Sequence, residues 1–109
     1  MLSFQQRLMK VNDALLSISG IQVNHYRKSA NVKAPYVVWQ ESGADSFGSD
    51  NYSSERCIEG TIDIYSLHEF DPLFDSVPEA LNGVASCRLN SVQYEDETKL
   101  IHYEYTFWC

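Results

Sequence analysis

The stretch SERCIEGTIDIYSL, residues 54–67, alternates polar and apolar side chains along its length. Its three isoleucines fall on one side of an extended chain, and Gly60 stands in register between the first and the second. Because successive side chains of a β-strand point to opposite faces, this alternation predicts a strand over 55–66 with one buried and one polar face. Gly60 indicates either a bulge or the close approach of another backbone.

An amphipathic helix precedes this strand. Ser3 and Gln6 have the spacing of a capping box, and Gly20 is a natural stop. Between them, apolar residues recur every three or four positions, which predicts a helix over 3–18 with one buried stripe. The stripe consists of Phe4, Leu8, Val11, Leu15 and Ile18.

A second helix is predicted over 71–82, between the 55–66 strand and the C-terminal segments. Asp71 is placed as its N-cap, with Pro72 at the first helical position and Gly83 at the end. Pro78 lacks a backbone N–H, so we expect a kink there or two short pieces. The apolar side consists of Leu73, Phe74, Val77 and Leu81.

Four further segments complete the expected sheet. They are the strands over 21–27, 35–42, 86–95 and 99–108, the last two joined as a hairpin. The order α-β-β-β-α-β-β predicts a single α+β domain over 1–109, with a mostly antiparallel sheet of about five strands and two helices packed on one face. Besides the helical stripe, the residues expected in the core include Ile62, Ile64, Leu81, Ile101 and Tyr103.

Composition excludes several functions. The 109 residues carry 15 acidic and 8 basic side chains, a formal net charge of −7, which disfavours a nucleic-acid binder. The apolar runs are too short to span a membrane, and the N-terminus lacks a signal-peptide pattern, so we expect a cytosolic protein without membrane partners.

Residue chemistry predicts neither catalysis nor a cofactor. Three distant cysteines fit neither a disulfide framework nor a zinc knuckle, and the three histidines lack metal-ligand spacing. His25 and His102 are potential neighbours across the sheet, and Cys87 is a potential neighbour of His102. Glu59 and Asp63 lie too far apart along one strand for a coupled acid–base pair. With Glu104 they predict an acidic, solvated sheet face.

The segment 43–52 is polar and contains two glycines, and it reads as a long exposed loop between two strands. Loops of this length inside a compact domain are uncommon and usually functional. This loop has no phosphate-binding glycine pattern. An aromatic side chain on a polar loop gains little by itself, so we expect Phe47 and Tyr52 either to be buried against a partner surface or, for Phe47, to fold back onto its own domain. The candidate interface residues are Asp45, Phe47, Asp50, Asn51 and Tyr52.

Four segments follow a recognisable order: PYVVWQESG (35–43), ADSFGSDN (44–51), EGTIDIYS (59–66) and, after the Asp-Pro-led helix, KLIHYEYTF (99–107). In this order the chain resembles tail-completion or tail-terminator proteins of long-tailed phages and prophages. In that family the helix after DIYS is usually regular and charged, so Pro78 is a departure.

The resemblance implies a structural virion protein and not an enzyme. Such a protein forms a homo-oligomeric ring, usually a hexamer, that caps the head-proximal end of the tail tube, stops tube polymerisation and forms the tail side of the head–tail joint. The implied partners are further copies of itself, the tail tube protein and a head-side connector, while DNA passes through without specific binding. Its location is the bacterial host cytoplasm during assembly and then the virion.

Two alternatives stay open. The chain is either another head–tail connector or stopper of the same phage class, or a small dimeric α+β ligand-binding domain or enzyme. Seven tyrosines and two tryptophans suit either a pocket or a subunit interface.

Overall fold

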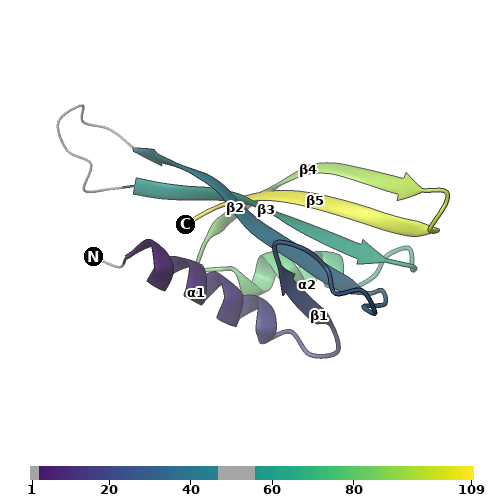
Figure 1. The fold of residues 1–109 in the computed structure, drawn as a ribbon. Coiled ribbons are helices and arrows are strands. Elements are labelled where there is room, and N and C mark those ends of the chain that lie inside the picture. Colours follow the sequence, from purple (N-terminus) through teal and green to yellow (C-terminus); the bar gives the residue numbers. More distant parts are fainter. Residues whose placement is uncertain (1–2, 47–55) are drawn as a thin grey trace.

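The computed structural model of the chain describes residues 3–46 and 56–109 (Figure 1). Its elements, in chain order, are α1 (Phe4–Leu16), β1 (Gln22–His25), β2 (Tyr36–Ser46), β3 (Arg56–Ser66), α2 (Leu73–Ala80), β4 (Ser86–Glu95) and β5 (Leu100–Trp108). The strands form one sheet in the order β1-β2-β3-β5-β4. Only β1 and β2 pair in parallel; the other neighbours are antiparallel. The predicted α+β class and element order are confirmed.

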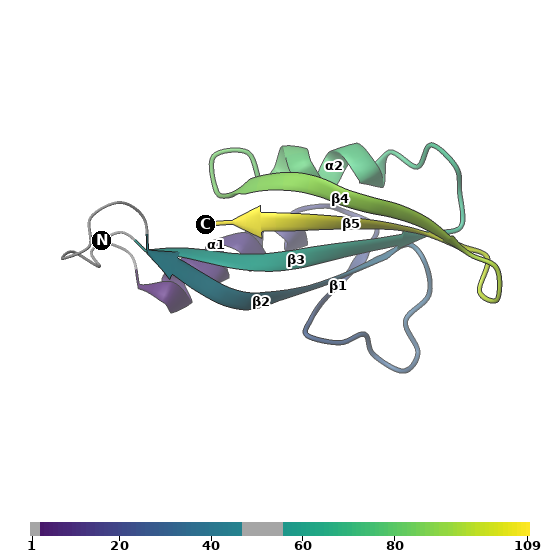
Figure 2. The same cartoon turned by 90° about the horizontal axis from the view of Figure 1, so that it is seen from above.

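Both helices pack against the same face of the sheet, and the opposite face is uncovered (Figure 1). Seen from above, α2 lies on the side of β4, while β1 and its connection to β2 lie at the other edge (Figure 2). The β4 edge of the sheet therefore lies beside α2, whereas the β1 edge lies beside the β1–β2 connection. Neither helix in the described part of the chain is long and apolar enough to cross a membrane.

Helix α1 begins as predicted and ends two residues early. The Gln6 backbone N–H donates to Ser3 Oγ at 3.1 Å, and the Ser3 N–H donates to Gln6 Oε1 at 2.9 Å, which completes the capping box. Val11 and Leu15 are fully buried. The prediction that Phe4 is buried is wrong, because its side chain is 40% exposed and lies in the first turn, outside the core cluster. Periodicity identifies the inner face of a helix but not how far the core extends beneath it.

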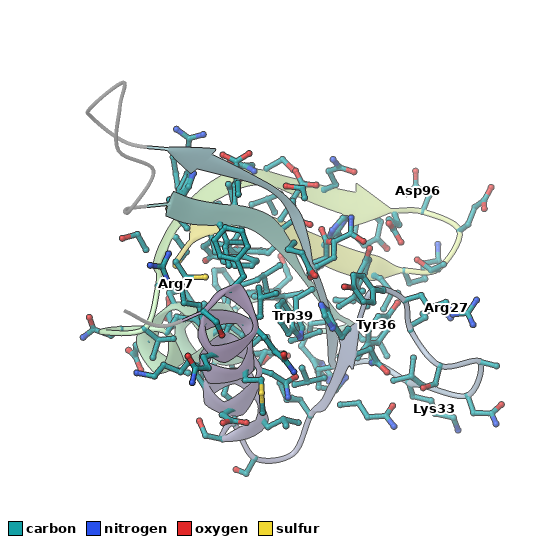
Figure 3. All side chains as sticks on the ribbon, turned by 60° about the vertical axis from the view of Figure 1, so that its left-hand side comes forward. Arg7, Arg27, Lys33, Tyr36, Trp39 and Asp96 are labelled. Carbon is teal, nitrogen blue, oxygen red and sulfur yellow. The ribbon has the colours of Figure 1, made fainter. Side chains whose placement is uncertain are left out.

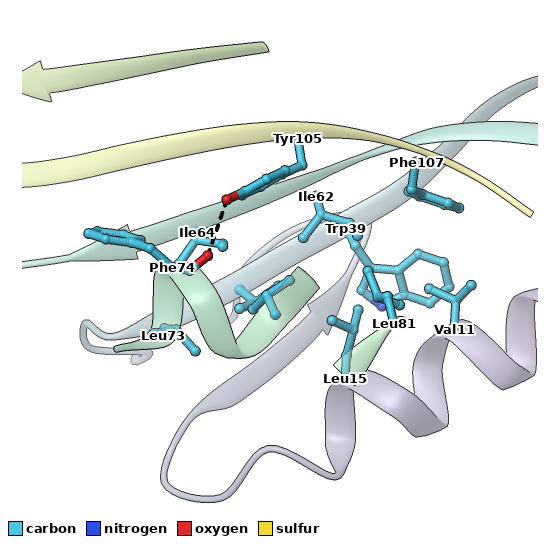
Figure 4. Packing of buried hydrophobic residues seen from close by; sticks show 12 residues of the cluster. Val11, Leu15, Trp39, Ile62, Ile64, Leu73, Phe74, Leu81, Tyr105 and Phe107 are labelled. Carbon is cyan, nitrogen blue, oxygen red and sulfur yellow. Dashed lines mark hydrogen bonds between the residues drawn. The ribbon is translucent and has the colours of Figure 1, made fainter. Parts of the chain in front are cut away.

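Helix α2 runs from Leu73 to Ala80 without a break, so the predicted division at Pro78 is not found. The helix begins after Pro72, one residue later than expected, yet Asp71 still caps it by accepting from the Leu73 N–H at 2.9 Å. Pro78 leaves the carbonyl of Phe74, four residues earlier, without a helical donor. The buried Tyr105 hydroxyl donates to that carbonyl at 3.1 Å (Figure 4).

The core lies between the sheet and the two helices (Figure 4). Ile62, Ile64 and Leu81 are fully buried as predicted, whereas Leu8, Ile101 and Tyr103 are half-buried and pack against the cluster. The complete buried cluster comprises Val11, Leu15, Val37, Trp39, Ile62, Ile64, Leu73, Phe74, Val77, Leu81, Tyr105 and Phe107.

Gly60 marks a close approach and not a bulge. A Cβ atom at this position would collide with the Gln40 carbonyl oxygen of β2 and the Phe107 ring of β5. The irregularity predicted as one option at Gly60 instead lies across the pair, on β2 between Glu41 and Gly43. Gly60 is therefore required because backbone and aromatic ring occupy the place of its side chain.

We expect Gly60→Ala to destabilise the fold by about 1–3 kcal/mol, because an extra methyl here forces strand or ring displacement. Urea unfolding followed by fluorescence measures the change. Gly43→Ala is the matched control, since a Cβ at Gly43 meets nothing within 4 Å. Equal stability of the Gly60→Ala variant and the wild type would contradict the packing assignment.

We expect Tyr105→Phe to cost about 1–2 kcal/mol of stability, because it leaves the buried Phe74 carbonyl without a donor. Pro78→Ala restores a helical N–H to that carbonyl. In the Pro78→Ala background, Tyr105→Phe should therefore cost less than it does in the wild type. The four proteins form a double-mutant cycle, and additive free energies would disprove the link between Pro78 and Tyr105.

Candidate binding surfaces

The first four residues of the predicted loop belong to a strand. Residues 43–46 continue β2 and pair with β3, with Ala44 opposite Ile58 and Asp45 opposite Cys57. Residues 43–46 form a strand although they are polar and include a glycine, because β3 supplies a hydrogen-bonding partner. A bulge between Glu41 and Gly43 accommodates the change of register. Asp45 is therefore a strand residue, and the prediction of a loop at 43–46 is wrong.

The remaining candidate interface residues lie outside the described residues. These are Phe47, Asp50, Asn51 and Tyr52, all within 47–55. Their predicted role in subunit or tube contact stays a prediction.

The histidines do not converge. The sheet order places β2 and β3 between His25 on β1 and His102 on β5. His25 Nε2 lies 2.7 Å from Glu41 Oε1, and His102 Nε2 lies 2.7 Å from Asp63 Oδ1. Among residues 3–46 and 56–109, no three His, Cys, Asp or Glu side chains are grouped as metal ligands.

Cys87 and His102 do not meet either. Cys87 pairs with Phe107, whereas His102 pairs with Gln93, so the two residues lie at different levels of the hairpin. All three cysteines are partly buried. Burial raises the pKa of the Cys87 and Cys109 thiols, which disfavours the reactive thiolate.

A groove of about 510 Å³ runs between α1 and the β1–β2 edge. We call it the aromatic groove. His25 forms its centre, stacked on Tyr26 at 3.8 Å and on Trp39 at 4.0 Å between ring centroids. The lining residues are Gln5, Leu8, Met9, Asn12, His25, Tyr26, Trp39 and Glu41.

The Glu41 carboxylate fixes this stack. Its two oxygens accept separate hydrogen bonds, one from Tyr26 Oη at 2.6 Å and one from His25 Nε2 at 2.7 Å. Burial raises the pKa of Glu41, but the bonds from Tyr26, from its own backbone and from His25 outweigh it, so the pKa is lowered. The same hydrogen bond, with smaller effects of burial and of the Glu41 charge, raises the pKa of Tyr26. At neutral pH the groove therefore contains an ionised carboxylate that accepts hydrogen bonds from the side chains of Tyr26 and His25.

No residue pattern predicts the Tyr26–Glu41 contact. Strict alternation along residues 21–27 places His25 and Tyr26 on opposite faces. Tyr26 instead has a φ of 79°, which ends the strand and turns its ring onto His25. A positive φ at a non-glycine residue is uncommon and has no sequence signature here.

The uncovered sheet face holds the predicted acidic residues, but it is not simply solvated. Asp63 stands opposite Glu104 and bonds His102, while Glu59 accepts from Trp108 Nε1 at 2.9 Å. All three carboxylates are partly buried.

A tyrosine stack adjoins these carboxylates. Tyr65 lies between Tyr36 and His102, with ring centroids at 4.8 and 4.3 Å. Burial, with a smaller contribution from nearby carboxylates including Asp63, raises the pKa of Tyr65 to about 12. Tyr65 therefore stays protonated at physiological pH, and its ring packs between those of Tyr36 and His102.

We expect Glu41→Gln to destabilise the fold at neutral pH by about 1 kcal/mol, because a neutral amide replaces a charged acceptor of two bonds. A carboxyl whose pKa is lowered on folding contributes stability above its unfolded pKa and loses it as pH falls through its folded pKa. The difference between variant and wild type should thus shrink below pH 4.5, the ordinary value for Glu41.

Thermal unfolding between pH 3 and pH 7 measures this dependence. Glu97→Gln is the control, since Glu97 is exposed in the β4–β5 turn. A pH-independent difference for Glu41→Gln would show that Glu41 acts through packing alone.

Comparison with known proteins assigns no family. No family model matches the chain, and no curated protein matches its sequence. The resemblance to tail-completion proteins therefore rests on the order and patterns of its segments. A function has to be argued from the surfaces of the described residues.

Proposed function

We propose that this chain is a structural phage protein that closes the head-proximal end of a tail tube as a homo-oligomeric ring. The observation that carries the proposal is the exposure of large apolar side chains at both edges of the sheet. Contiguous exposed apolar surface on a small domain marks interaction sites.

One of these surfaces, the β1 edge, comprises Met9, Leu16 and Tyr26. Their exposed fractions are 55%, 57% and 57%. Met9 and Leu16 are seven residues apart on α1 and so share one helical stripe. Met9 and Tyr26 line opposite sides of the aromatic groove.

The other surface, the β4 edge, comprises Phe70, Leu89, Val92 and Tyr94. Phe70 is 93% exposed, and Leu89, Val92 and Tyr94 are between 43% and 58% exposed. Phe70 and Leu89 line a common hollow with Asp75 and Tyr103. Exposure arises because α2 covers only part of this side of the sheet (Figure 2).

These two surfaces differ in residues and lie at opposite edges of the sheet. A contact between unlike patches is heterologous, and it closes into a ring when the rotation between subunits permits. The proposed ring, a hexamer by the family resemblance, stops tube polymerisation and forms the tail side of the head–tail joint. Its partners are the tube protein and a head-side connector, with assembly in the host cytoplasm before incorporation into the virion.

The aromatic groove supports a second candidate, a ligand-binding domain. Stacked rings beside a fixed carboxylate suit a small aromatic or cationic ligand. The indole N–H of Trp39 also supports a ligand in the groove, because it is buried and has no hydrogen-bond partner among the described residues.

Deleting the gene from its phage or prophage tests the main proposal. We expect overlong or unattached tails, seen by electron microscopy, and restoration by a plasmid copy of the wild type. Phe70→Ser with Tyr94→Ser should fail to restore normal tails, because it removes apolar contact area at the β4 edge.

Glu41→Gln is the matched control and should restore normal tails. If Glu41→Gln fails while the β4-edge variant succeeds, the groove carries the function and the ring proposal is wrong. Normal tails in the deletion strain would also refute it.

A further inference from the structure

Charge is divided between the two ends of the sequence. Residues 1–34 contain five basic side chains and one acidic, whereas residues 35–109 contain three basic and fourteen acidic. In the fold the first segment forms α1, β1 and the β1–β2 connection, and α2 and β4 belong to the second. The β1 edge is therefore built from the basic segment, whereas α2 and β4 at the other edge belong to the acidic segment (Figure 2).

The basic side chains extend the β1 edge. Arg27, Lys28 and Lys33 are exposed on the connection that follows Tyr26. Arg27 and Lys33 point away from the sheet into solvent (Figure 3). Lys28 lines the same hollow as Tyr26 on the uncovered face. The β1 edge thus combines apolar and positively charged groups.

The acidic side chains extend the β4 edge. Asp75 lines the hollow that contains Phe70 and Leu89, and Glu79 lines another with Ser86 and Cys87 at the start of β4. Asp75 and Glu79 are four residues apart on α2, so they share one helical face. Both are exposed.

These charges form no ion pair within residues 3–46 and 56–109. None of the ion pairs there includes Arg27, Lys28, Lys33, Asp75 or Glu79, although Lys28 shares its hollow with Asp63 and Glu95. Opposite charges beside exposed apolar groups are typical of complementary interfaces, where they fix the register and exclude wrong partners.

We infer that the β1 edge of one copy docks on the β4 edge of the next, with Lys28 and Lys33 facing Asp75 and Glu79. The occupant of each edge is thus a second copy of this chain. Charge complementarity favours this contact over the like-with-like alternatives, because a β1–β1 contact would bring Lys28 and Lys33 against their own copies and a β4–β4 contact would bring Asp75 and Glu79 against theirs. The inference specifies the subunit contact of the proposed ring, but it concerns self-association and holds whatever the ring caps.

Two charge-reversal variants test the contact. Variant one is Lys28→Glu with Lys33→Glu, and variant two is Asp75→Lys with Glu79→Lys. Each should weaken self-association at least about a hundredfold, since like charges across an interface cost several kcal/mol and each tenfold is 1.4 kcal/mol. Sedimentation over a dilution series measures the effect, and high salt should weaken the wild type.

Mixing supplies the decisive measurement. In an equimolar mixture, the negative β1 edge of variant one meets the positive β4 edge of variant two, and the native β1 edge of variant two meets the native β4 edge of variant one, so alternating assembly should return. An isologous contact would not be weakened in either variant alone, because reversing both of its sides leaves like charges facing each other as in the wild type; loss in each variant alone together with rescue on mixing therefore identifies the contact between unlike edges. Circular dichroism verifies that each variant is folded.

Asp96→Lys with Glu97→Lys is the matched control. It changes the net charge as much as variant two does, but in the exposed β4–β5 turn and not on α2. It should associate like the wild type. Equal loss in this control, absence of rescue on mixing, or a wild type that stays monomeric at every concentration would each overturn the inference.

Different results would refute the subunit contact and the tail function. Self-association through these edges in a protein whose deletion leaves tails normal would retain the contact and reject the tail role. Normal tails from variant one or variant two alone would reject the contact and retain the role.

Discussion

The close approach at Gly60 is the constraint on which the rest of the fold depends. Strand β3 is central, and at Gly60 the β2 backbone and the Phe107 ring of β5 take up the space of a side chain. Phe107 reaches from there to Trp39, edge to face, with ring centroids 6.0 Å apart. Trp39 and Phe107 are the largest fully buried side chains, so the position of this pair sets the space that α1 and α2 fill.

A second constraint ties α2 to the sheet. Pro78 removes one helical hydrogen bond, and Tyr105 of β5 replaces it at the Phe74 carbonyl. Phe74 also stacks on Tyr103 with ring centroids 3.6 Å apart. The helix is therefore held to β5 by a directional bond and a ring contact in addition to apolar burial. This attachment fixes the acidic face of α2 beside β4, which a self-docking surface requires.

Local patterns predicted most of the architecture because local physics decides those features. The capping box at Ser3 and the alternation through Ile62 and Ile64 depend on neighbours in sequence, and both were found. The end of α2 was predicted less well, because the helix stops at Ala80 and not at Gly83. The failures depend on tertiary context. Phe4 is exposed because of where the core ends, and Pro78 stays inside a helix because a distant tyrosine supplies its missing donor.

The candidate site was less predictable than the fold. The aromatic groove requires the positive φ of Tyr26 and the reach of Glu41 from another strand, neither of which leaves a residue pattern. The polarity of segment 43–52 predicts a loop there, yet residues 43–46 belong to strand β2. The uneven distribution of charge between residues 1–34 and 35–109 was readable from sequence, but its meaning depends on the sheet order.

The charge division also answers a general hazard of open sheets. An unprotected edge strand such as β4 can pair with a second copy of itself, and natural proteins prevent this with charges and bulges. Strand β4 has a bulge at Asn90, between Leu89 and Ser91, and acidic residues of α2 lie beside it. Two such edges repel one another, whereas the opposite edge of the same molecule carries the complementary charge. The acidic residues that keep two β4 edges apart would thus favour a contact between the β4 edge of one copy and the β1 edge of the next.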